Sequence, residues 1–139
     1  MRSSKSPRAL IDVLIVEDDA ITRLAVRRLL EGQGYTCAEA ENGREAVEIV
    51  RQCRPRLVLL DLMMPELDGF TVAEQLRSDP HTCDIPIHCL TGLDFPAAHR
   101  AAQRSGCEVV LTKPLDLEGL LDVVSVALSP GPNVPAAAM

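Results

Sequence analysis

Four apolar residues, Leu57 to Leu60, run directly into Asp61, and a loop that contains Pro65 and Gly69 follows. A short continuous apolar run bounded by turn residues is typical of a strand buried on both faces, as in a parallel sheet. Asp61 would then lie at the carboxyl end of that strand, which is the edge of an open α/β sheet where ligands bind. This position makes Asp61 the first candidate for a nucleophile.

Apolar runs of strand length alternate along the chain with segments of helical period. We expect strands over residues 11–16, 35–40, 57–60, 85–90 and 108–111, and a helix after each of them, beginning near residues 20, 43, 69, 96 and 115. Asn42 is expected to cap the second helix, and Pro86 weakens the start of the fourth strand. Strands that alternate with helices imply right-handed crossovers and a three-layer α/β sandwich.

The length of 139 residues fits one folded domain. We expect a loose polar leader over residues 1–9, the folded domain over residues 10–128, and a tail or linker over residues 129–139. The tail is rich in proline and alanine and carries no charged side chain, a composition typical of a linker.

The charge and aromatic content argue against a nucleic-acid-binding protein. The formal net charge is -6, and the chain has two Phe, one Tyr and no Trp. Phosphate backbones would repel such a chain, and it offers few rings on which bases could stack. We therefore expect no nucleic acid as a partner. No signal peptide or membrane span is visible in the sequence either, and we expect no membrane as a partner.

The five cysteines are expected to be free thiols. Their number is odd, no two are spaced C-x-x-C, and most lie in apolar segments, where free cysteine behaves as a small hydrophobe. This usage indicates a reducing cytoplasm rather than a disulfide scaffold. A metal site around the fourth strand is not expected either, because its cysteines and histidines lack the spacing of closed zinc sites: His81, Cys83, His88 and Cys89.

Polar residues stand at the ends of four of the predicted strands. Glu17 and Asp18 follow the first strand, Asp61 the third, Thr91 the fourth and Lys113 the fifth. Each alone is typical of a helix cap, a turn or the surface. Because the carboxyl ends of parallel strands share one edge, we expect these five side chains to meet in one pocket.

The residue types in this predicted pocket suit phosphoryl transfer. Three carboxylates repel one another, and a hard cation such as Mg²⁺ with oxygen ligands would relieve that repulsion. Asp61 could then attack a phosphoryl group and form an aspartyl phosphate. Lys113 supplies a positive charge for one phosphoryl oxygen, and Thr91 can donate a hydrogen bond to another.

Residues 11–128 resemble the receiver domain of two-component response regulators. The resemblance is carried by four elements in this order and spacing: Val16–Asp19, Leu59–Phe70, Leu90–Gly92 and Thr112–Pro114. It implies a flavodoxin-like fold with a five-stranded parallel sheet in the order 2-1-3-4-5 and five helices.

The resemblance also assigns roles in the pocket. It implies that Asp61 is the phosphoacceptor and that Asp18 binds Mg²⁺ directly, with Glu17 beside it, through water. The backbone carbonyl of Met63 would complete the protein ligands of the metal. Thr91 would be the switch hydroxyl that moves toward the phosphoryl group, and Lys113 would pair with that group, next to a cis peptide bond.

The resemblance further implies a signalling switch rather than a turnover enzyme. The phosphodonor would be a phosphohistidine on a histidine kinase or a histidine phosphotransfer protein. The output would pass to an effector protein, or to an effector domain outside this chain, through the surface of the fourth helix, fifth strand and fifth helix. Dimerisation stays open.

The chain departs from the family pattern near the expected switch. Val110 stands where an aromatic residue is usual, and Gly92 replaces the usual alanine after the switch threonine, which would loosen that loop. Met63 and Leu93, each two residues beyond a site residue, are apolar and unable to orient an attacking water. We therefore expect the phosphoryl group to be lost slowly.

Two other functions can be weighed against a phosphorylated switch. An aspartate-nucleophile phosphatase of the haloacid-dehalogenase type needs a second aspartate two residues after the nucleophile, and Met63 stands there. A receiver-like interaction module that works without phosphorylation is left open by Val110. The complete set of acceptor residues argues against it: Asp18, Asp61, Thr91 and Lys113.

Overall fold

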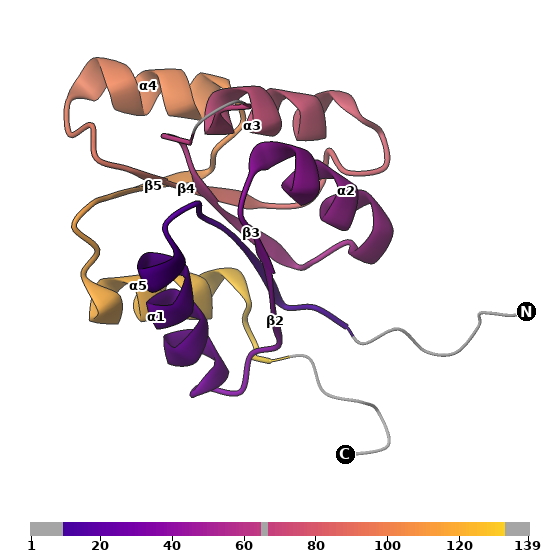
Figure 1. Cartoon of the computed structure of the whole chain (residues 1–139), viewed down its shortest axis with the longest axis vertical. Helices are drawn as coiled ribbons and strands as arrows, with labels where there is room; N and C mark the ends of the chain where they lie inside the picture. Colours follow the sequence, from indigo (N-terminus) through magenta and orange to yellow (C-terminus); the bar gives the residue numbers. More distant parts are fainter. Residues whose placement is uncertain (1–9, 65–66, 133–139) are drawn as a thin grey trace, which may run out of the picture.

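The computed structural model describes residues 10–64 and 67–132, which form a five-stranded parallel sheet between two layers of helices (Figure 1). The predicted leader over residues 1–9, the loop residues 65–66 and residues 133–139 of the predicted tail lie outside this part. The elements in chain order are β1 Val13–Val16, α1 Ala20–Glu31, β2 Cys37–Ala40, α2 Gly43–Cys53, β3 Leu57–Asp61, α3 Gly69–Ser78, β4 Ile87–Thr91, α4 Pro96–Arg104, β5 Val109–Thr112 and α5 Leu117–Ala127.

The strands lie in the order β2-β1-β3-β4-β5, as predicted, and every neighbouring pair is parallel. The helices α1 and α5 cover one face of the sheet, and α2, α3 and α4 cover the other (Figure 1). The predicted flavodoxin-like fold is therefore confirmed.

Each face of the sheet has its own aliphatic core, because alternate strand residues point to opposite faces. In β1, Leu14 and Val16 pack on the α2–α3 side, whereas Val13 and Ile15 pack on the α1–α5 side. All residues of β1, β3 and β4 are buried, which explains their continuous apolar runs. The edge strand β5 is only half-buried.

Capping side chains set the start of four of the five helices. Asp19, Asn42, Asp68 and Asp116 each accept a hydrogen bond from a backbone N–H in the first turn. The cap predicted at Asn42 is confirmed, since its side chain accepts from the N–H of Glu45. The fifth helix begins at Leu117, two residues later than predicted, because Asp116 caps it there.

The fourth strand begins at Ile87 rather than at residue 85. Proline has no N–H to donate to the sheet, and Pro86 contributes only its carbonyl, which accepts from the N–H of Val58 at 3.0 Å. The strand continues to Thr91, so this threonine is part of the sheet rather than of the loop.

The prediction of five free thiols is wrong for two of them. Cys89 in β4 and Cys107 before β5 form a disulfide, with their Cα atoms 5.9 Å apart. They are 18 residues apart in sequence, and the parallel pairing of β4 with β5 brings them together. Cys37, Cys53 and Cys83 are free.

Both ends of the described chain lie at the amino edge of the sheet. The Arg56 guanidinium, just before β3, donates to the carboxylate of Asp12 at 2.9 Å and to the carbonyls of Leu128 and Gly131. The segment after α5 thus contacts the domain as far as Gly131. Within the described residues, no helix is long and apolar enough to span a membrane.

Candidate functional site

Asp61 is the last residue of β3 and is buried. One of its carboxylate oxygens accepts a hydrogen bond from the N–H of Met63 at 3.0 Å. The loop after it returns so closely that a Cβ on Gly69 would lie 2.5 Å from the Asp61 carbonyl oxygen. This glycine therefore permits a backbone approach that fixes the position of the carboxylate.

Three carboxylates meet beside the end of β3. Glu17, Asp18 and Asp61 each offer an oxygen, and these oxygens lie within 4.8 Å of one another. Glu17 is buried and accepts from the N–H of Asp19 at 3.2 Å, whereas Asp18 is exposed. An all-oxygen donor set with one solvent-facing carboxylate fits a hard cation such as Mg²⁺, which keeps several waters when bound.

Lys113 joins two of these carboxylates. Its ammonium donates to Glu17 at 2.8 Å and to Asp61 at 3.3 Å. Burial tends to lower the pKa of Lys113, but the two carboxylates outweigh that effect, and the pKa lies above its ordinary value. The side chain is therefore a fixed cation at neutral pH, and the Lys113–Pro114 peptide bond is cis, as the resemblance implies.

Burial raises the pKa of the Glu17 carboxyl. The Lys113 ammonium opposes this rise, and the neighbouring Asp61 carboxylate adds to it. The Asp61 carboxylate thus adds to the cost of keeping Glu17 charged, and a cation beside the two groups relieves that cost. The electrostatics of the site thus favour cation binding.

Thr91 ends β4 and is buried. Its hydroxyl oxygen accepts a hydrogen bond from the N–H of Leu93 at 3.0 Å, and its carbonyl accepts from the N–H of Lys113 at 2.7 Å. The backbone of Thr91 is therefore tied to the residue that contacts Asp61. A Cβ on the following Gly92 would meet no atom within 4 Å.

The structure thus places the predicted acidic and basic residues in one cluster at the carboxyl edge. Glu17, Asp18, Asp61 and Lys113 lie together, and Thr91 joins them through the backbone of Lys113. The N–H of Met63 binds Asp61, and the role of its carbonyl as a metal ligand stays a prediction.

Arg23 contacts the edge of the site, a position that the sequence pattern does not predict. Its guanidinium donates to the backbone carbonyl of Glu17 at 2.7 Å and pairs with Glu39 at 2.7 Å. Arg27, one turn later on α1, also pairs with Glu39. Their four-residue spacing in the sequence predicts that the two arginines share one face of a helix. The spacing does not predict that both pair with Glu39 on β2.

A family model described as the response regulator receiver domain matches residues 13–125. The chain belongs to this family. The receiver domain is similar to the response regulator MprA of Mycolicibacterium vanbaalenii, with 41% identity over 80% of this chain and 47% of that protein. It is also similar to the DNA-binding dual master transcriptional regulator RpaA of Synechocystis, with 38% identity over 91% of this chain and 52% of RpaA.

The receiver domain thus spans about half the length of these two relatives. A shorter relative, protein PilH of Pseudomonas aeruginosa, is 36% identical over 84% of this chain and 97% of its own length. Among solved structures, the chemotaxis protein CheY4 of Vibrio cholerae has a TM-score of 0.80 and 29% identity, covering 86% of this chain and all of CheY4.

Proposed function

We propose that this receiver domain accepts a phosphoryl group on Asp61, in a Mg²⁺-dependent reaction, and thereby changes its binding to another protein. The observation that carries this proposal is the contact of one ammonium, Lys113, with both Asp61 and Glu17. It joins a buried carboxylate nucleophile to a cation that can hold the incoming phosphoryl group. The donor is proposed to be a phosphohistidine on a histidine kinase or a histidine phosphotransfer protein.

In the proposed reaction, a carboxylate oxygen of Asp61 attacks phosphorus. The new O–P bond replaces the P–N bond of the phosphohistidine, and the imidazole nitrogen leaves with the electron pair. The N–H of Met63 holds one Asp61 oxygen in place, and Lys113 stabilises negative charge on the phosphoryl oxygens. A Mg²⁺ ion held by Asp18 and Asp61, with Glu17 beside it and the Met63 carbonyl completing the set, would neutralise further charge there.

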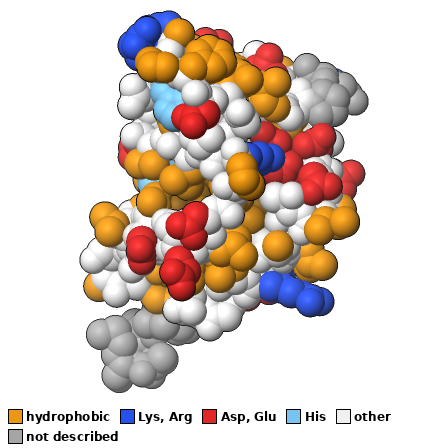
Figure 2. Space-filling view, turned by 90° about the vertical axis from the view of Figure 1, so that its left-hand side faces the viewer, with side chains coloured by type: hydrophobic (Ala, Val, Ile, Leu, Met, Phe, Trp, Pro, Cys, Tyr) orange, Lys and Arg blue, Asp and Glu red, His pale blue; other side chains and the backbone are white. Residues whose placement is uncertain are grey.

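The proposed output uses the face formed by α4, β5 and α5. Figure 2 shows apolar side chains distributed over this face between acidic groups. Its large exposed apolar residues include Phe95 before α4, and Leu117 and Val126 on α5. The proposal is that the Thr91 hydroxyl turns toward the phosphoryl group and shifts the following loop, which changes the surface offered to an effector protein or domain.

Incubation with acetyl phosphate and Mg²⁺ tests the proposal. We expect intact-mass analysis to show one added phosphoryl group, which is lost in Asp61→Asn and when the metal is chelated with EDTA. Asp84→Asn is the matched control, because Asp84 is an exposed carboxylate paired with Arg54 away from the cluster. No phosphorylation of the wild type would instead support an interaction module that works without phosphate.

The aspartyl phosphate is expected to be long-lived. Met63 and Leu93 are apolar, so neither can orient a water for attack on phosphorus. We expect the half-life of the phosphorylated domain to be minutes or longer, and Met63→Asn to shorten it whereas Met63→Leu does not. Loss of phosphate from the purified domain measures this, and a wild-type half-life of seconds would contradict it.

A further inference from the structure

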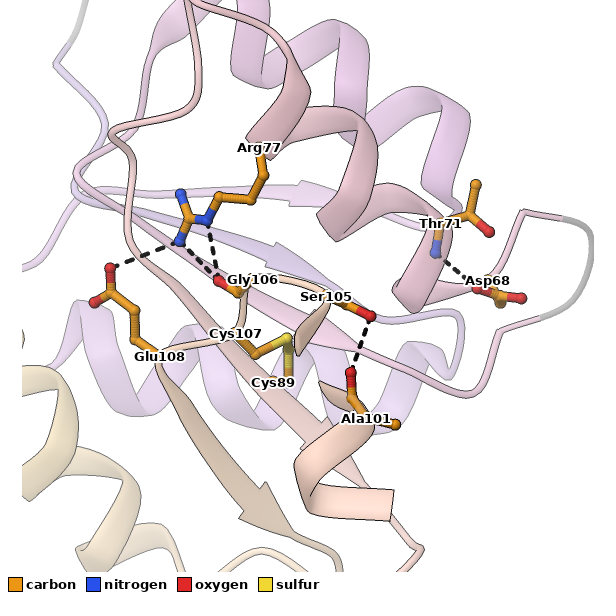
Figure 3. The surroundings of a disulfide bond; sticks show 9 residues. All are labelled: Asp68, Thr71, Arg77, Cys89, Ala101, Ser105, Gly106, Cys107 and Glu108. Atoms are coloured by element: carbon orange, nitrogen blue, oxygen red, sulfur yellow. Dashed lines mark hydrogen bonds and ion pairs between the residues drawn. A yellow bond between two sulfur atoms is a disulfide. The ribbon is translucent and has the colours of Figure 1, made fainter. Parts of the chain in front are cut away.

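The disulfide lies next to the segment that the proposed switch would move. Cys89 is in β4, two residues before Thr91, and Cys107 lies between α4 and β5 (Figure 3). The bond therefore closes a loop that contains Thr91, residues 92–95 and the whole of α4. Crosslinking the ends of such a loop restricts the conformations that it can reach.

Apart from this bond, α4 makes few buried contacts with the rest of the domain. Ala102 is its only buried residue, and Phe95, at its N-cap, is exposed and makes no side-chain cap hydrogen bond. The firm contacts are at its carboxyl end, where the N–H of Cys107 donates to the Ala102 carbonyl at 3.1 Å. The packing of α4 against the sheet therefore depends on the position of the segment that contains Cys107.

Arg77 provides a noncovalent link in the same place. From α3, its guanidinium donates to the carbonyl of Gly106 at 2.8 Å and to those of Cys83 and Ile85 at 2.8 and 2.7 Å (Figure 3 shows the bonds to Gly106). These bonds tie the segments before β4 and before β5 to α3 without the disulfide. The fold therefore has a means of surviving reduction, and both cysteines lie in an apolar core where thiols also pack well.

We propose that Cys89 and Cys107 are a reversible redox site that restrains α4 against β4 when oxidised and, when reduced, leaves that end of α4 to the noncovalent contacts of Ala102 and Arg77. This proposal rests on the proposed function, from which it takes the cellular compartment. A switch driven by phosphohistidine works in the cytoplasm, where disulfides are usually transient and redox-sensing. The chemical class of the oxidant is a small-molecule disulfide, such as oxidised glutathione.

The exchange proceeds in two steps. The Cys107 thiolate attacks the small disulfide, forming a mixed disulfide and releasing one glutathione thiolate. The Cys89 thiolate then attacks the Cys107 sulfur, which forms the protein disulfide and releases the second glutathione. Two electrons pass from the cysteines to glutathione, and the two protons of the cysteine thiols are taken up by the released thiolates.

Cys107 is assigned the first attack because of its surroundings. Cys89 is fully buried in the interior of the sheet, and Cys107 is 4% exposed with the exposed Glu108 beside it. In the proposed exchange, the segment between α4 and β5 opens by breaking the Arg77 bonds to Gly106, which uncovers Cys107 while β4 stays in the sheet. In the oxidised form, the disulfide prevents this segment from opening and thereby restrains residues 92–95, which follow Thr91.

Thiol trapping tests the redox site on the full chain. The protein is equilibrated with mixtures of reduced and oxidised glutathione, quenched with acid, alkylated with N-ethylmaleimide and mapped by peptide mass spectrometry. We expect Cys89 and Cys107 to lose alkylation together as oxidised glutathione rises, and to regain it in excess reduced glutathione. Cys53→Ser is the control that should behave as wild type, whereas Cys107→Ser should leave Cys89 without its disulfide.

Hydrogen exchange tests the consequence for α4. We expect amides of residues 96–104 to exchange about tenfold more slowly in the oxidised than in the reduced wild type, and not to respond to glutathione in Cys107→Ser. A pair that stays alkylated at every ratio, a bond that excess reduced glutathione cannot open, or equal exchange in both forms would each overturn the proposal. None of these readouts needs phosphate, so their failure is distinct from failure of the proposed phosphorylation.

Discussion

Replacing Lys113 with methionine is expected to slow the phosphorylation of Asp61 by acetyl phosphate about 100-fold, the usual effect of removing one preorganised charge-stabilising donor. The ammonium lies 3.3 Å from the Asp61 carboxylate and 2.8 Å from that of Glu17. Methionine keeps the length of the side chain but removes the charge that would hold the phosphoryl oxygens. Initial rates followed by intact-mass analysis measure the effect.

The same substitution should change Mg²⁺ binding in the opposite direction. Without the ammonium, the repulsion between Glu17 and Asp61 loses its internal counter-charge, so a bound divalent cation relieves more unfavourable energy. We expect tighter Mg²⁺ binding in Lys113→Met than in wild type by isothermal titration calorimetry. Unchanged phosphorylation, or weaker Mg²⁺ binding, would contradict the role assigned to Lys113.

Replacing Arg56 with methionine is expected to lower the free energy of unfolding by about 3 kcal/mol, as for other buried ion pairs that lose one partner. Asp12 is completely buried, with one carboxylate oxygen 2.9 Å from the Arg56 guanidinium and the other 2.9 Å from the N–H of Thr36. The substitution also removes the donors to the Leu128 and Gly131 carbonyls. Urea denaturation measures the loss.

Arg51→Met is the matched control for Arg56. Arg51 also pairs with an aspartate, Asp79, but its side chain is 56% exposed, and an exposed pair contributes about 1 kcal/mol or less. Adding Asp12→Asn to Arg56→Met should recover part of the lost stability, because the buried carboxylate that has lost its ion pair with Arg56 is then replaced by a neutral amide. Equal destabilisation by the two single arginine variants would contradict the importance assigned to burial.

The sheet and the carboxyl-edge cluster could be predicted because both follow from local patterns. Leu57 to Leu60 identifies a strand buried on both faces, and parallel strands bring Asp61 and Lys113 to one edge wherever the chain between them runs. The sequence predicts the start of β4 two residues too early, at residue 85 instead of Ile87, because a proline at the edge of a strand does not show where pairing begins.

Contacts between elements that lie far apart in the sequence could not be predicted from the sequence pattern. The Cys89–Cys107 bond requires a short Cα separation, and two positions 18 residues apart in the sequence do not reveal it. The contact of Arg23 with the Glu17 carbonyl likewise depends on how α1 sits over the end of β1. Such contacts arise from the packing of a helix on a strand, which periodicity alone does not specify.

The Arg56 contacts have a further consequence for how a partner can approach. They place the residues before β1 and those after α5 at the amino edge of the sheet, the end opposite Asp61. The first and last described residues therefore lie at one end of the domain, and the acidic cluster lies at the opposite end. A fluorescent label placed at Gly131 would lie at this end of the domain, so that binding to the opposite end could be measured without obstruction.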